Sequence, residues 1–169
     1  YDSVSDIFNY SEHLFSDLNY YFITIDNSSS GKRINQKPIF TNFDKTIIAF
    51  DDFHVHEVNS ENLIQSGREW FGERFGIIDS YSFNFNFPNL INSSAVTIKT
   101  SVAARSLNSS YFTVNANNNF ISSINISNIV YDYATQYARS AQNTSQFNSN
   151  SDQITVNVEY NYSENNAIG

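Results

Sequence analysis

A strict alternation of apolar and polar residues, in three separate stretches, limits this chain to few folds. With Thr100 as the one exception, apolar side chains take every second position over residues 81–87, 96–102 and 154–162, with polar side chains between them. Successive side chains of a strand point to opposite faces, so each stretch predicts a strand with one buried and one wet face. Such strands are typical of antiparallel sheets. We therefore predict an all-β fold, an antiparallel β-sandwich of jelly-roll type with one or two short helices.

Weaker patterns predict further strands. Residues 18–25 carry apolar groups on both faces, which indicates a central strand. The turn-forming run 26–31 follows them. Further strands are predicted at 32–40, 46–56, 111–114 and 120–126.

One helix and one ambiguous stretch complete the predicted elements. Asn59 or Ser60 is a suitable cap for a short helix that carries Leu63 and Ile64 and ends at Gly67. Over 131–150 the apolar spacing allows a helix, while the density of Asn and Ser favours strand and loop.

We expect one β-rich domain over residues 1–169. The chain has no methionine, so we expect it to be a piece cut from a longer protein. We also expect a final strand beyond Gly169, and without that strand the sheet has an open edge prone to pairing between chains.

Composition and charge exclude several classes of partner. The net charge of −8, from 17 acidic and 9 basic residues, argues against binding to nucleic acid or to an anionic membrane surface. Apolar runs such as 47–50 are far shorter than the roughly 20 residues of a membrane span. There is no cysteine, hence no disulfide, thiolate nucleophile or cysteine-ligated zinc.

The densest polar group, residues 51–57, offers weak candidates for a metal site. On a strand, Asp52, His54 and His56 point to one face, which brings two imidazoles and a carboxylate within reach of one ion. A complete site needs a further ligand, and a solvated strand face is the simpler interpretation. Serine hydrolases leave no signature here, because no Gly-x-Ser-x-Gly elbow occurs. We predict no catalytic residues and no cofactor.

Carbohydrate binding is an alternative function. Eleven tyrosines and one tryptophan supply ring faces that stack on sugars, and asparagine amides suit hydroxyl groups. The competing interpretation is that the alternating aromatic residues form the core of the sandwich. The alternative function is a stand-alone carbohydrate-binding module at the cell surface.

Residues 66–73, Ser-Gly-Arg-Glu-Trp-Phe-Gly-Glu, contain the only tryptophan and two of the five glycines. This segment resembles the S-G-R-E-W-F-G-E signature of the PorU family, the sortases of the type IX secretion system, which are gingipain-like C25 cysteine peptidases. Residues 10–17, 20–22 and 31–34 are similar to the family's approach to that signature. The alternating strands beyond Tyr81 are similar in layout to the β-rich region that precedes the family's peptidase domain.

The resemblance implies a role for the parent protein. That protein would remove C-terminal sorting domains from secreted cargo at the outer membrane and help attach the cargo to surface lipopolysaccharide. The family's chemistry uses a Cys/His pair in a caspase-like domain, and this chain has no cysteine. The resemblance therefore assigns the chain to the non-catalytic region ahead of the peptidase. Its implied partners are the downstream peptidase domain, outer-membrane components of the secretion system and cargo, at the cell surface.

Two interpretations of the 66–73 segment remain open. The glycines permit a bent backbone, Trp70 and Phe71 offer apolar area, and Arg68 has Glu69 and Glu73 as candidate partners. One interpretation is a packed turn that closes the entry to the sandwich. The other is a docking edge for the peptidase domain or a partner.

Overall fold

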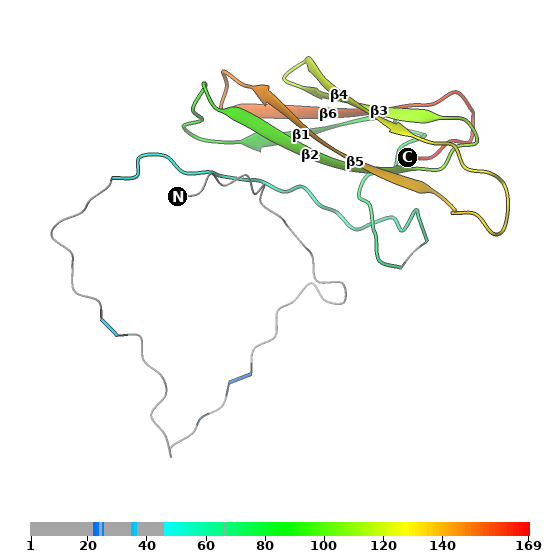
Figure 1. Cartoon of the computed structure of the whole chain (residues 1–169), viewed down its shortest axis with the longest axis horizontal. Helices are drawn as coiled ribbons and strands as arrows, with labels where there is room; N and C mark the ends of the chain where they lie inside the picture. The colour runs from blue at the N-terminus through cyan, green and yellow to red at the C-terminus, as the bar shows by residue number, and fades with distance from the viewer. Residues whose placement is uncertain (1–21, 24, 26–34, 37–45, 66) are drawn as a thin grey trace. The chain divides into compact units, whose positions relative to one another are not determined.

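The alternating stretches form strands in the computed structural model of the chain, which describes residues 22, 23, 25, 35, 36, 46–65 and 67–169. The chain divides into two units, residues 1–53 and 54–169, and the strands lie in the second (Figure 1). The strands are β1 (Ser80–Asn86), β2 (Ala95–Ala104), β3 (Ser110–Ala116), β4 (Asn119–Ile126), β5 (Arg139–Asn148) and β6 (Gln153–Asn161).

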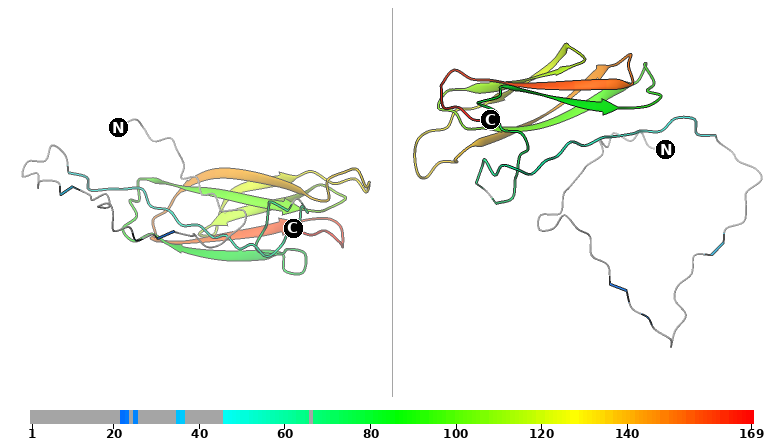
Figure 2. Two further views of the ribbon diagram at one scale, coloured as in Figure 1. Left: turned by 90° about the horizontal axis from the view of Figure 1, so that it is seen from below. Right: turned by 180° about the vertical axis from the view of Figure 1, so that it is seen from behind.

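These strands make two antiparallel sheets. One sheet has four strands in the order β1-β6-β3-β4, and the other consists of β2 and β5 (Figures 1 and 2). In the larger sheet Phe83 lies opposite Val156 and Phe112 opposite Tyr160, so apolar residues share one face. The all-β antiparallel sandwich predicted from the sequence is confirmed.

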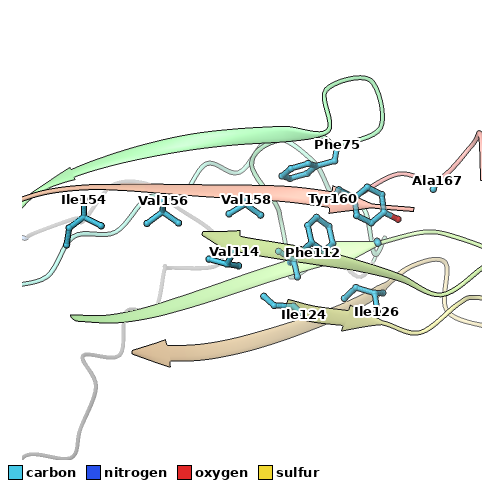
Figure 3. Close-up of a cluster of buried hydrophobic side chains, with 12 residues drawn as sticks. Phe75, Phe112, Val114, Ile124, Ile126, Ile154, Val156, Val158, Tyr160 and Ala167 are labelled. Carbon is cyan, nitrogen blue, oxygen red and sulfur yellow. The ribbon is translucent and has the colours of Figure 1, made fainter. Parts of the chain in front are cut away.

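The core lies between the two sheets. Figure 3 shows Ile154, Val156, Val158 and Tyr160 on one side of β6. They form a single cluster with the labelled side chains of β3 and β4. Val102 and Ala104 of β2 meet this cluster from the smaller sheet. At one end the rings of Phe112 and Tyr160 stack with centroids 4.6 Å apart. Phe75, from the loop before β1, packs edge-on to Phe112 at 5.3 Å.

The residues before β1 and at the end of the chain meet beside this aromatic cluster. The N–H of Phe75 donates to the carbonyl of Gly169 at 2.7 Å, and that of Arg105 donates to the carbonyl of Ile168 at 2.8 Å. Gly76 has a φ of +119°, and a Cβ there would lie 2.8 Å from the carbonyl oxygen of Ala167. Only glycine accepts both the left-handed backbone and this close approach.

Edge strand β1 is less completely covered than the central strands. Its inward residues Phe83 and Phe85, and Phe87 directly after the strand, are half-buried, whereas the inward residues of β6 are buried. The smaller sheet has two strands and the larger has four. The inward side chains of β1 are therefore covered in part by residues that lie outside the two sheets.

Two predicted elements differ from the structure. Residues 46–56, predicted as a strand, form none and are exposed. The helix predicted from Asn59 or Ser60 to Gly67 is wrong, because this segment is a turn in which Gln65 and Gly67 have left-handed φ values of 58° and 71°. No helix occurs among the residues that the structure describes. By contrast, the strand and loop favoured by the composition of 131–150 are confirmed, because a loop precedes β5 there.

The remaining predictions concern parts of the chain that the structure leaves open. The strands at 18–25 and 32–40 lie mostly outside the described residues, and the few described positions there are not in strands. One domain over 1–169, and a final strand beyond Gly169, stay predictions.

The stacked aromatic core predicts a large difference between two Phe→Ala substitutions. Phe112 is 1% exposed, so Phe112→Ala leaves a cavity and should lower the free energy of unfolding by about 3–5 kcal/mol. Phe120 is 66% exposed, and Phe120→Ala should cost less than about 1 kcal/mol. Urea unfolding measures both. Equal losses in the two variants would contradict this packing.

The buried phenol of Tyr160 should make the folded protein less stable at alkaline pH. Burial raises the pKa of its phenol above the ordinary 10.0, the hydrogen bond with Ser110 lowers it, and nearby Glu164 raises it. The folded protein therefore keeps this proton to higher pH than the unfolded chain does. The contribution to stability is complete below about pH 10 and is lost as the pH rises through the folded-state pKa. Tyr160→Phe should lose less stability than the wild type between about pH 9 and 12, measured by urea unfolding. Parallel pH profiles would contradict the assignment.

Candidate interaction surface

Residues 60–73 form a closed loop, called here the 60–73 loop. Glu61 and Phe71 make an isolated antiparallel bridge, in which each backbone N–H donates to the other's carbonyl at 2.8 Å. The N–H of Ser60 donates to the carbonyl of Phe71 at 3.0 Å, and its hydroxyl donates to the carbonyls of Phe71 and Gly72. The loop is thus closed by backbone pairing at its base.

Glycine is favoured for a different structural reason at each of the two glycine positions of the 66–73 segment. Gly67 supplies a left-handed backbone at the tip of the turn, one position where glycine is favoured. Gly72 lies against the preceding chain, where a Cβ would stand 3.0 Å from the carbonyl oxygen of Val58. The bent backbone predicted for this segment is confirmed.

The side chains of the 66–73 segment divide between the loop interior and solvent. Phe71 and Glu73 are half-buried, whereas Arg68 and Glu69 are exposed. Trp70 keeps 48% of its surface exposed. Tryptophan is enriched among the anchor residues of protein interfaces, so Trp70 is the candidate anchor of this loop.

Glu73 connects the loop to the segment before it. Its Oε1 lies 2.7 Å from Nε2 of His56, with both side chains partly exposed. Arg74 approaches Glu61 at 3.5 Å across the base of the loop. Partly exposed ion pairs such as these orient side chains and add little stability. No local pattern in the sequence indicates the pairing of His56 with Glu73, because 17 residues separate them.

Residues 54–58, called here the histidine arm, lie beside β1 and cover part of its aromatic face. The ring of His54 stands 4.8 Å from that of Phe87, and the ring of His56 stands 4.5 Å from that of Phe83. Nε2 of His54 lies 3.0 Å from the carbonyl oxygen of Asn86. The arm therefore supplies some of the cover that the smaller sheet does not give to β1.

The metal candidates are not brought together as a metal site. The carboxylate of Asp52 accepts a hydrogen bond from the N–H of Phe53 at 2.8 Å. Each histidine has a partner of its own, Asn86 for His54 and Glu73 for His56. Among the described residues, no group of three or more His, Cys, Asp or Glu side chains is placed to hold an ion.

One further absence concerns membranes. Over the part of the chain that the structure describes, no helix has the length and apolar character needed to cross a bilayer.

Comparison with known proteins gives a likeness to a solved structure. No protein-family model matches the chain, and no curated protein matches it. The structure is similar to the crystal structure of dimeric latent PorU from Porphyromonas gingivalis, with a TM-score of 0.53 and 20% sequence identity. The likeness covers 67% of this chain and 11% of that one. At this identity it supports a shared fold.

The base of the 60–73 loop predicts a local effect of Ser60→Ala. Losing the hydroxyl bonds to Phe71 and Gly72 should speed amide exchange at Phe71 about tenfold. The amide of Tyr160, which donates to the carbonyl of Asp79 at 2.8 Å, serves as the control in the same sample. Hydrogen–deuterium exchange measures both. Equal acceleration at the two amides would contradict a local role.

Proposed function

We propose that this chain is a non-catalytic β-sandwich domain of a PorU-like sortase of the type IX secretion system. In this role it positions a downstream C25 cysteine peptidase domain, or the secreted cargo, at the outer membrane. The observation that carries the proposal is the pairing of a PorU-like fold with the 66–73 segment. In the structure that segment is a closed loop with an exposed tryptophan.

The loop favours docking over a purely internal role. A turn that only locks the sandwich would bury its largest apolar side chain, because burying a tryptophan removes a large apolar area from water. Here Trp70 is half-exposed, and Arg68 and Glu69, which lie between Gly67 and Trp70 in the sequence, are exposed. Exposed aromatic and arginine side chains are the usual anchors of protein interfaces.

The proposal implies that the gene encodes a peptidase domain after residue 169. The chain covers 11% of the length of its structural neighbour, so the peptidase activity, cargo and surface location proposed for the whole protein depend on residues outside 1–169. The reading frame should continue past Gly169 into a caspase-like domain with a Cys/His pair. A stop codon shortly after Gly169 would remove the peptidase from the proposal.

The docking role predicts variants that fold normally and fail in processing. Trp70→Ala, Arg68→Ala and Glu73→Ala, made in the full-length protein in its own bacterium, should each keep the melting temperature within a few degrees. Trp70→Ala should lower removal of the cargo's C-terminal domain about tenfold or more, the effect of losing an interface anchor. Mass spectrometry of secreted cargo measures this.

Tyr133→Ala is the matched control, since Tyr133 is fully exposed on the loop between β4 and β5. It should leave processing unchanged. Normal processing in all three loop variants would overturn the docking role and leave the segment as a packed turn.

A further inference from the structure

The face of the four-stranded sheet that points away from the core is polar and nearly uncharged. Figure 3 shows the inward side chains of β6 on one side of the strand, so the alternate residues of β6 lie on the other. The register adds the alternate residues of β1 and β3 to this outward side, called here the polar face. Their partners in β4 belong to it as well, and these are Asn125, Ser123 and, past a register shift, Phe120. Over these four strands Glu159 is its one carboxylate, and it has no lysine or arginine.

Side-chain hydrogen bonds between strands hold the polar face in a fixed arrangement. Amide and hydroxyl groups bond in pairs across the strands: Gln153 with Asn86 at 2.6 Å, Thr155 with Asn84 at 2.7 Å, Asn157 with Ser82 at 3.1 Å, and Asn161 with Thr113 at 3.1 Å.

These pairs leave hydrogen-bonding capacity toward solvent. A primary amide has two N–H donors and an oxygen with two acceptor sites, so one bond to a neighbour does not exhaust it. The cross-strand bonds also fix the rotamers in advance, which lowers the entropy lost when a ligand binds. The polar face is therefore a preorganised array of uncharged donors and acceptors.

Two exposed aromatic rings belong to the same face. Tyr111 on β3 is 43% exposed, and Phe120 on β4 is largely exposed and lies opposite Asn115 of β3. Tyr111 and Asn115 are four residues apart on one strand, which corresponds to about 13 Å. The rings thus lie at separate positions along the face, with amide and hydroxyl groups beside them.

A shallow depression of about 550 Å³ adjoins the ring of Tyr111. Asn161, Glu159 and Asp79 contribute polar groups to it, and Tyr162 adds a second phenol whose hydroxyl donates to Asp79 at 3.0 Å. Two carboxylates at this end oppose an anionic ligand, in agreement with the net charge of −8.

We propose that the polar face binds a neutral polysaccharide chain. Pyranose rings offer hydroxyl groups to the amide array and C–H faces to Tyr111 and Phe120. The face lacks the apolar centre of a protein interface and the basic groups that nucleic acids or acidic glycans need. This site lies on the four-stranded sheet and uses residues outside the 60–73 loop. The proposal is therefore independent of the proposed sortase role.

Affinity electrophoresis of the whole 1–169 chain tests the proposal. Native gels are cast with hydroxyethylcellulose, mixed-linkage β-glucan, galactomannan or xylan, each separately, and with alginate as an anionic polymer. At least one neutral polymer should retard the wild type, and alginate should not. Tyr111→Ala and Phe120→Ala should each weaken binding about threefold to tenfold, while Tyr111→Phe, which keeps the ring, should bind nearly as well as wild type.

Tyr133→Ala, outside the polar face, is the control and should bind as the wild type does. Circular dichroism shows that each variant is folded. Migration unchanged by all four neutral polymers would overturn the proposal. Retardation that survives the Tyr111→Ala/Phe120→Ala double variant would overturn the assignment to this face. Neither outcome bears on cargo processing, so failure here is distinguishable from failure of the docking role.

Discussion

The contact of Phe112 with Tyr160, with Phe75 packed on its edge, ties three distant parts of the second unit together. It joins β3 to β6 inside the larger sheet, and it brings in the loop before β1 through Phe75. The same end receives the final residues, since Phe75 and Gly169 exchange backbone hydrogen bonds. The 60–73 loop ends just before Phe75, so the chain that follows the loop directly is anchored by this ring packing.

Parts of the fold that depend on local pattern could be predicted from the sequence. The alternation over 81–87, 96–102 and 154–162 gave β1, β2 and β6, because one face of each strand meets an apolar core. Strand β5 was harder to recognise. Two of its inward positions are Asn143 and Ser145, which bond to each other, so its pattern of apolar residues is interrupted.

Features that depend on distant pairing could not be predicted. The turn at 60–67 has the composition of a short capped helix, but the bridge between Glu61 and Phe71 closes it as a loop. The local sequence around His56 does not indicate that Glu73 is its partner. The spacing of residues 51–57 instead suggests a metal site with Asp52 and His54. The pairs of the polar face join residues such as Thr155 and Asn84, which lie next to each other only when the register of β1 and β6 is known. The 66–73 segment was recognised as unusual, while the exposure of its tryptophan came from the structure alone.

The placement of Trp70 has a practical consequence for spectroscopy. The chain has one tryptophan, and it lies on the exposed loop rather than in the core, where Tyr160 and Phe112 are buried. Tryptophan emission therefore reports the surroundings of the 60–73 loop, and near-ultraviolet tyrosine signals include the packing of the sandwich. A single sample thus carries two separate optical readouts, one for the candidate docking surface and one that includes the core.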